Sequence, residues 1–171
     1  MSKALSDLKK EIEKCRKCKN PAPWSFPKRN NVAGVLGDSD IMFVGDRPST
    51  GEWDKANELF YDLLRNNGFE RAHLTDITKC GRKVKQKVSL EEIRNCLVYF
   101  ERELAIIRPR AIVALGNKTH TMLQGLLPAL WKQDVQLEKI WHYSYASRFK
   151  KEEEYEARFR ELKRKLDRKV K

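Results

Sequence analysis

The sequence predicts an α/β fold, a three-layer α/β/α sandwich built on a central, mostly parallel sheet of four strands. Two observations lead to this prediction. Short apolar segments with the length of buried strands alternate along the chain with longer segments of helical periodicity. The 171 residues contain no internal repeat and no evident linker, so we expect one domain over residues 1–171. Strands alternating with helices in one domain are typical of a parallel sheet covered on both faces.

The first half of the chain is expected to supply two helices and one strand. An amphipathic pattern predicts a helix over residues 2–14, and residues 41–45 read as a buried strand that ends at a glycine. Ser49 and Glu52 have the spacing of a capping box, which predicts that a second helix follows them. The Asn67-Gly68 pair is a suitable end for that helix.

The second half repeats the alternation. Further strands are expected at residues 73–78, 111–115 and 139–143. Helices are expected over residues 89–107, 118–127 and 151–171. Ser89 opens the first of these helices, because Ser89 and Glu92 form a second capping-box pattern. Pro109 marks its exit.

Ligands of parallel α/β sheets bind beyond the carboxyl ends of the strands. Four residues stand at or just after the predicted strand ends, namely Asp46, Asp76, Gly116 and His142. We therefore expect them to lie along one rim of the sheet.

Composition indicates a polyanionic partner. The formal net charge is +12, which favours nucleic acid first and an anionic membrane surface second. The longest apolar run, residues 111–115, is far shorter than the ~20 residues that span a bilayer. The first ten residues show no secretory signal, so we expect a cytoplasmic monomer with no membrane partner. Abundant Lys and Glu fit a hot-adapted organism.

The four cysteines suggest a shared metal. Cys15-x-x-Cys18 is a chelating pair, whereas Cys80 and Cys96 stand far away in the sequence. Disulfides are unusual in a cytosolic chain, and unrelated buried thiols use the residues less economically. Four thiolates suit zinc or an iron–sulfur cluster, and the spacing alone leaves these two about equal.

Five segments carry a resemblance to a known family. They are C-R-K-C at 15–18, I-M-F-V-G-D-R-P at 41–48, L-T-D-I-T-K-C at 74–80, I-R-P-R-A-I-V-A-L-G at 107–116 and H-Y-S-Y-A-S-R at 142–148. In content and order they resemble the iron–sulfur uracil-DNA glycosylases, family 4 of the uracil-DNA glycosylase superfamily. Similar motifs there include Gly-Glu-Ala-Pro-Gly, Ile-Thr-Asn-hydrophobic-hydrophobic-Lys-Cys and His-Pro-Ser-Tyr-x-x-Arg. The resemblance implies a structural [4Fe–4S] cluster held by Cys15, Cys18, Cys80 and Cys96.

The resemblance also implies catalytic roles. A glycosylase flips a nucleotide out of the stack and cuts the bond between base and deoxyribose. Asp46 would stabilise positive charge on the sugar or orient the attacking water, although it could also cap the following helix. His142 would donate a hydrogen bond to the departing base, although a place in an aromatic cluster is the alternative. His73 and His120 are expected to be ordinary surface or helix residues.

Residues for binding the base and the backbone follow from the same comparison. Trp53 is the aromatic nearest to the position where the family stacks a phenylalanine, but its helical periodicity slightly favours the core. Ser49 precedes free helical N–H groups that could hold a phosphate or a base oxygen. Arg148, Lys150 and Lys151 are expected to contact the DNA backbone. A solvated surface is the alternative for any single lysine, but residues 82–87 are basic enough to be expected to bind as a group, namely Arg82, Lys83, Lys85 and Lys87.

Asp76 is the informative departure from the family. The family has an asparagine there, which offers uracil both a donor and an acceptor, whereas an ionised aspartate can only accept. An acceptor suits a deaminated or alkylated purine such as hypoxanthine or alkyladenine, and this is our first expectation. Uracil is the alternative if burial keeps Asp76 protonated. Arg47, Ser49 and Tyr143 also differ from the family motifs, so the base pocket is expected to be rebuilt.

Two hypotheses of other classes stay open at this point. The chain could be an iron–sulfur nucleic-acid binder that has lost glycosylase chemistry, because three motifs depart from the family. It could also be a scaffold that holds zinc. Retention of both Asp46 and His142 argues against the loss of chemistry.

Overall fold

The computed structural model describes residues 3–18, 39–48, 54–80 and 88–168. Its four strands are β1 (Ile41–Gly45), β2 (His73–Asp76), β3 (Ala111–Leu115) and β4 (Gln136–Ile140). They form one sheet in the order β2-β1-β3-β4, and every neighbouring pair is parallel. The described helices are α1 (Lys3–Glu13), α2 (Lys55–Asn66), α3 (Leu90–Ile107), α4 (Asn117–Leu130), α5 (Tyr143–Arg148) and α6 (Glu152–Arg168).

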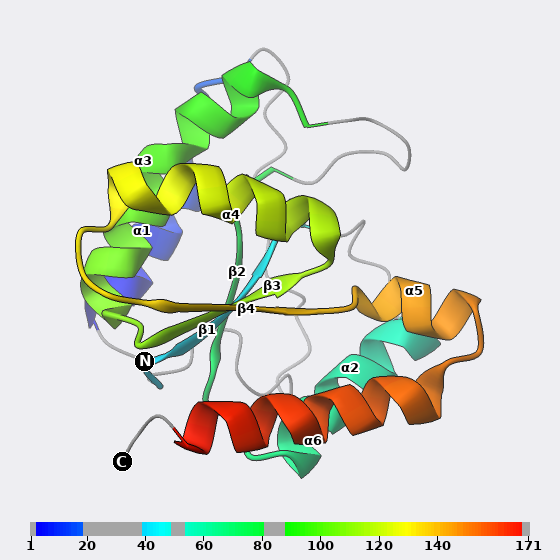
Figure 1. Ribbon diagram of the computed structural model, residues 1–171. Helices are drawn as coiled ribbons and strands as arrows, with labels where there is room; N and C mark the ends of the chain where they lie inside the picture. Colours follow the sequence, from blue (N-terminus) through cyan, green and yellow to red (C-terminus); the bar gives the residue numbers. More distant parts are fainter. Residues whose placement is uncertain (1–2, 19–38, 49–53, 81–87, 169–171) are drawn as a thin grey trace.

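Helices cover both faces of the sheet, as Figure 1 shows. Alternation along β1 explains the two layers, because successive side chains of a strand point to opposite faces. Phe43 faces a cluster with α2, α5 and α6, whereas Met42 and Val44 face a cluster with α3 and α4. The predicted three-layer α/β/α architecture is therefore confirmed, and the sheet is parallel throughout the described strands.

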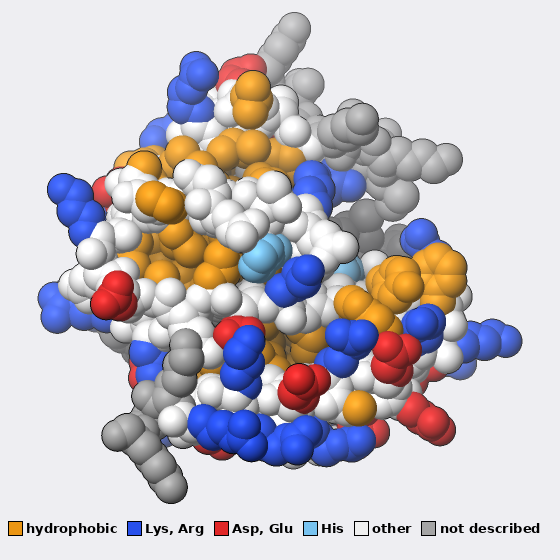
Figure 2. Space-filling model, viewed as in Figure 1, with side chains coloured by type: hydrophobic (Ala, Val, Ile, Leu, Met, Phe, Trp, Pro, Cys, Tyr) orange, Lys and Arg blue, Asp and Glu red, His pale blue; other side chains and the backbone are white. Residues whose placement is uncertain are grey.

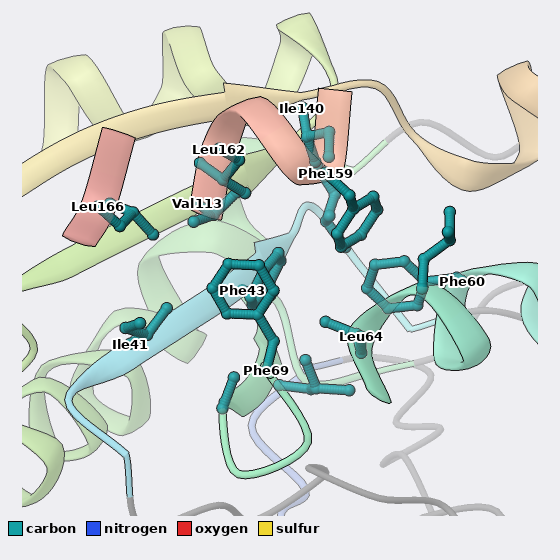
Figure 3. Close-up of a cluster of buried hydrophobic side chains, with 14 of the residues drawn as sticks. Ile41, Phe43, Phe60, Leu64, Phe69, Val113, Ile140, Phe159, Leu162 and Leu166 are labelled. Atoms are coloured by element: carbon teal, nitrogen blue, oxygen red, sulfur yellow. The ribbon is translucent and has the colours of Figure 1, made fainter. Parts of the chain in front are cut away.

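Phe43 is the centre of the larger core cluster (Figure 3). Its ring meets Phe69 edge-on at 5.3 Å and stacks on Phe159 of α6 at 6.2 Å. All three side chains are fully buried. Burial of an aromatic side chain contributes on the order of 2–3 kcal/mol, so these contacts fix β1 against α6.

Several element boundaries differ from the sequence predictions. The prediction that α2 begins at the Ser49 capping box is wrong, because the N-cap is Asp54, whose Oδ1 accepts from Asn57 N at 2.9 Å. The capping box of α3 is confirmed, with Ser89 and Glu92 bonded reciprocally. In the described residues, no helix is long and apolar enough to cross a membrane.

The last strand also lies earlier than predicted. β4 occupies Gln136–Ile140 instead of residues 139–143, and the chain then forms the short helix α5. β4 is an edge strand and only Ile140 of its five residues is buried, so its apolar signal is weak. This shift leaves His142 between β4 and α5, where it is the N-cap of α5.

Candidate functional site

The carboxyl ends of the strands bring the predicted rim residues to one edge of the sheet. Asp76 ends β2, Asp46 directly follows β1, Gly116 follows β3, and His142 lies two residues beyond β4. The charge of Asp46 acts on both Asp76 and His142. Gly116 has a φ of +93°, and a Cβ atom there would lie 3.5 Å from His142 Cβ. The 3.5 Å separation is an ordinary contact, so it is the positive φ of the turn after β3 that favours glycine here.

Asp76 lies over the end of β1. Gly45 is its partner in the β1–β2 register, and a Cβ atom on Gly45 would collide with Asp76 Oδ1. Burial raises the pKa of Asp76 to about 7, Lys79 opposes the shift, and the charges of Asp46 and Glu103 add to it. Near neutral pH, Asp76 is thus divided between the acid and the carboxylate.

Asp46 is held by both its backbone and its carboxylate. Its carbonyl oxygen accepts from Thr78 N at 3.2 Å and from Thr78 Oγ1 at 3.0 Å. Its Oδ2 lies 2.6 Å from Lys118 Nζ in the first turn of α4, where Lys118 is 59% exposed and Asp46 is 22% exposed. Asp46 does not cap α2, since Asp54 fills that position. The carboxylate therefore stays at the rim.

The N-cap contact of His142 fixes its tautomer. Nδ1 accepts from Ser144 N at 3.2 Å and lies 2.7 Å from Ser144 Oγ. Burial lowers the pKa of His142, although Asp46 acts in the opposite direction. A neutral ring that accepts at Nδ1 carries its proton on Nε2. His142 is thus a neutral donor. It also stacks on Tyr143 at 4.2 Å, so the aromatic contact expected as an alternative is present as well.

Two tyrosines act beside Asp76, of which sequence reasoning missed Tyr61 and noted Tyr143 only as a departure from the family motif. Tyr61 and Tyr143 are half-buried, and the charge of Asp76 acts on both. Burial raises the pKa of Tyr61 to about 12, with Asp76 adding to the shift, and burial also raises the pKa of Tyr143. Tyr143 stacks on Phe60 at 5.2 Å. A tyrosine in place of the family proline after the histidine was the available signal.

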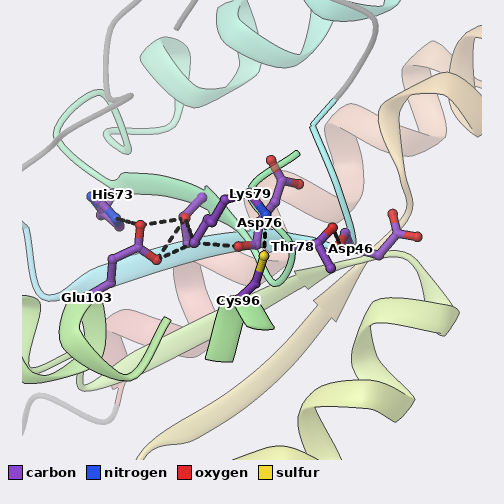
Figure 4. A network of polar contacts seen from close by, with 8 residues as sticks. Asp46, His73, Asp76, Thr78, Lys79, Cys96 and Glu103 are labelled. Atoms are coloured by element: carbon purple, nitrogen blue, oxygen red, sulfur yellow. Dashed lines mark hydrogen bonds and ion pairs between the residues drawn. The ribbon is translucent and has the colours of Figure 1, made fainter. Parts of the chain in front are cut away.

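A buried polar network lies behind Asp76 (Figure 4). Lys79 Nζ contacts Glu103 Oε2 at 2.6 Å, Thr75 Oγ1 at 2.7 Å and the Asp76 carbonyl oxygen at 2.5 Å. Thr75 Oγ1 lies 2.9 Å from both Glu103 oxygens. Lys79 and Glu103 are both buried, so the opposite charge of each offsets the cost of removing the other from water.

His73 belongs to the same network. The expectation that it is an ordinary surface or helix residue is wrong, because His73 is the first residue of β2 and is fully buried. Its Nε2 lies 3.9 Å from Glu103 Oε1, which is beyond hydrogen-bonding distance. His120 lies in α4, as expected for a helix residue.

The four cysteines lie around the start of α3 and the end of α1. All are free thiols; Cys18, Cys80 and Cys96 are buried and Cys15 is half-buried. Cys96 Sγ accepts from Lys79 N at 3.3 Å. Burial raises the pKa of the Cys96 thiol to about 11, and Cys80 and Cys18 add to this shift. Yet none of the described residues form a group of three or more ligands arranged to hold a metal ion.

Of the residues predicted to contact the base or the DNA backbone, the structure describes only some. Arg148 is exposed at the end of α5, and Lys150 and Lys151 follow that helix. Other predicted residues for binding base or backbone lie outside the described residues, namely Ser49, Trp53, Arg82, Lys83, Lys85 and Lys87. Lys118 was missed by sequence reasoning, although its place two residues after Gly116 puts it at the same rim.

Comparison with known proteins points to one family. The uracil DNA glycosylase superfamily matches residues 33–166 of this chain. A type-4 uracil-DNA glycosylase of Archaeoglobus fulgidus is 33% identical over 124 residues, which cover 67% of this chain and 60% of the relative. That of Sulfurisphaera tokodaii is 28% identical over 162 residues, which cover 88% of this chain and 70% of the relative. That of Pyrobaculum aerophilum is 30% identical, with coverages of 72% and 66%.

The chain thus spans about 60 to 70% of the length of these curated relatives. Among solved structures, the wild-type SMUG2 of Pedobacter heparinus matches with a TM-score of 0.59 and 13% identity, covering 76% of each chain. At that identity the likeness concerns the fold.

Proposed function

Because the chain belongs to the uracil DNA glycosylase superfamily, we propose that it is a monofunctional DNA N-glycosylase of base excision repair. It flips a damaged base out of DNA and hydrolyses the bond between that base and deoxyribose. The observation that carries the proposal is the shared rim of Asp46, Asp76 and His142 at the ends of β1, β2 and β4. The protein would act as a cytoplasmic monomer on chromosomal DNA, with no membrane partner.

His142 and Asp46 divide the chemistry between leaving base and sugar. Bond cleavage builds negative charge on the base and positive charge on the sugar. The Nε2–H of neutral His142 donates to the base as its charge develops. The carboxylate of Asp46 stabilises the sugar cation or orients the attacking water. Lys118 holds that carboxylate and is itself well exposed, so a DNA phosphate can draw Lys118 away and free Asp46.

Asp76 reads the base, and its protonation state selects which base is accepted. As a carboxylate it accepts from the N1–H of hypoxanthine or the amine of an alkyladenine. As a carboxylic acid it offers uracil a donor and an acceptor, as an asparagine does. The first candidate substrate is a deaminated or alkylated purine, which the enzyme accepts when Asp76 is a carboxylate. The second candidate is uracil, which it accepts when Asp76 is a carboxylic acid. The raised pKa of Asp76 and the names of the relatives favour this second candidate.

Base preference is expected to change with pH. Asp76 has its pKa raised from 3.8 to about 7, so the acid form dominates below that pH and the carboxylate above it. Uracil excision should rise relative to hypoxanthine or alkyladenine excision as the pH falls from about 8.5 to about 5.5. The measurement is the single-turnover release of each base from oligonucleotides with one lesion, scored as abasic sites.

Asp76→Asn is the matched control for this titration. It keeps the size of the side chain and removes its ionisation, so the ratio of uracil to purine excision should become independent of pH. A wild-type ratio that does not change with pH would contradict the role of Asp76. Binding to lesion DNA without abasic sites from any base would instead favour the non-catalytic iron–sulfur binder.

We also propose that Cys15, Cys18, Cys80 and Cys96 hold a [4Fe–4S] cluster. Cys96 lies in α3, and the charges of Cys18, which follows α1, and Cys80, which follows β2, act on it. This supports the proposal, because thiolates are the usual ligands of such clusters. The cluster would tie α1 to α3 and to the end of β2, which is a structural role.

Loss of the cluster is expected to cost folding together with colour. The purified protein should be brown with broad absorption near ~400 nm, whereas a zinc scaffold should be colourless. Cys96→Ser, or acid treatment, should remove the absorption and lower the melting temperature. Iron analysis and thermal unfolding check this, and a colourless wild-type protein with bound zinc would refute the cluster.

A further inference from the structure

Three aromatic side chains form a continuous ladder beside His142. The Trp141 and Tyr145 rings meet edge-on at 5.1 Å, and Tyr145 and Phe149 are tilted at 4.7 Å. The spacing of four residues places the three rings on one side of the chain as it enters and follows α5. Arg158 of α6 lies 3.8 Å from the Trp141 ring centre and braces this end of the ladder.

The free end of the ladder is open to solvent. Tyr145 is 41% and Phe149 is 55% exposed, and large exposed hydrophobic residues are few in the described part of the chain. Figure 2 shows an orange patch over α5, with blue cationic side chains around it. Scattered exposed apolar residues need no explanation, but two aromatic rings in contact at the edge of a candidate site do.

The charges around the ladder are mixed but ordered. Arg148 and Lys150 are exposed and flank Phe149 in the sequence. Lys151 lies over the Trp141 ring at 5.2 Å and pairs with Glu154 at 3.2 Å. Glu154 also pairs with Arg158, whereas Glu152 and Glu153 add negative charge at the start of α6. A polyanion is thus attracted on the Arg148–Lys150 side and repelled from the α6 turn.

We propose that Tyr145 and Phe149 stack on unpaired bases of a single DNA strand that enters the site along α5. Base faces are covered by neighbouring bases inside a duplex, whereas an unpaired base offers its π-face to an aromatic ring. Cations beside stacking aromatic rings are typical of proteins that track a single strand. The inference rests on the proposed function, and it specifies that single-stranded or locally opened DNA is the preferred substrate.

The test is binding to DNA without a lesion, so its outcome does not depend on base excision. The probes are a fluorescein-labelled single-stranded oligonucleotide of mixed sequence and the duplex of the same sequence. The double variant Tyr145→Ala/Phe149→Ala should lose about 10- to 100-fold in affinity for the single strand. Its affinity for the duplex should stay within about twofold, and the salt dependence should not change because no charge is removed.

Two controls separate stacking from a general change of surface. Tyr145→Phe keeps the ring and should bind the single strand like the wild type. Val98→Ala removes an apolar side chain of similar exposure, 40%, from α3 on the other side of the sheet, and should have no effect. Quenching of 2-aminopurine in the strand should also be lost only when the rings are removed.

Three outcomes would overturn the inference. They are an equal loss of affinity for both DNA forms, no loss for either form, and a wild-type dimer that the double variant converts to a monomer. The last outcome would assign the ladder to a second copy of this chain. A wild type that binds single strands through these rings but releases no base from any lesion would leave this inference standing and refute the proposed glycosylase.

Discussion

His142→Ala is expected to lower the rate of base excision by about 10²- to 10³-fold, the usual effect of removing one donor to a developing anion. The reason is the fixed direction of the ring. Ser144 occupies Nδ1, so the proton sits on Nε2 and is available to the leaving base. Because burial lowers the pKa of His142, the ring is already neutral near neutral pH. The neutral ring is the proposed donor, so the rate should not fall when the pH rises through the pKa of His142. Single-turnover excision under saturating enzyme measures this directly.

The alanine variant also removes the N-cap of α5, which costs about 1 kcal/mol of stability. His142→Asn is the matched control, because asparagine is a good N-cap but cannot place a donor where the imidazole Nε2 lies. It should restore the melting temperature without restoring the rate. Ser144→Ala should be mild, since the backbone N–H to Nδ1 is kept. Excision by His142→Ala within about threefold of the wild type would rule out donation by His142 as a major source of rate.

The rim could be predicted because the sequence pattern locates the ends of the central strands. Asp46 and Gly116 directly follow apolar runs that are typical of buried strands, whereas Asp76 ends a shorter strand in which only Leu74 is apolar. The parallel order brings the ends of these strands together. β4 was misplaced by three residues because an edge strand alternates only weakly between apolar and polar positions. Local periodicity therefore locates central strands better than edge strands.

Pairings across the fold were not predictable from spacing. Lys118 meets Asp46 across 72 positions, and Glu103 meets Lys79 across 24. A buried histidine, lysine or glutamate looks like a surface residue in a single sequence, because its burial depends on a partner that the fold supplies. For this reason His73 was misjudged, and Lys79 was noticed only as part of a motif.

Lys79→Met is expected to destabilise the protein by about 3–5 kcal/mol, because it leaves the Glu103 carboxylate buried without its partner. Lys10→Met is the matched control. Lys10 pairs with Asp7 at 3.8 Å on an exposed face of α1, and loss of such a pair costs less than about 1 kcal/mol. Urea unfolding of both variants measures the difference. Lys79→Met/Glu103→Leu should recover much of the lost stability, since replacing both charges by apolar groups is often neutral.

The recovered double variant separates a structural role of this pair from a role in recognition. Lys79 lowers the pKa of Asp76 and also holds its carbonyl oxygen at 2.5 Å. Glu103 raises the same pKa, so removing both charges leaves the position of the Asp76 backbone as the larger change. If the network only stabilises the fold, the refolded double variant should excise each base at the wild-type ratio. If the network also positions Asp76, the rates of uracil and hypoxanthine excision should become nearly equal, although the melting temperature of the double variant is normal. Only the second result connects the buried lysine to base choice, because it appears in a protein whose stability has been repaired.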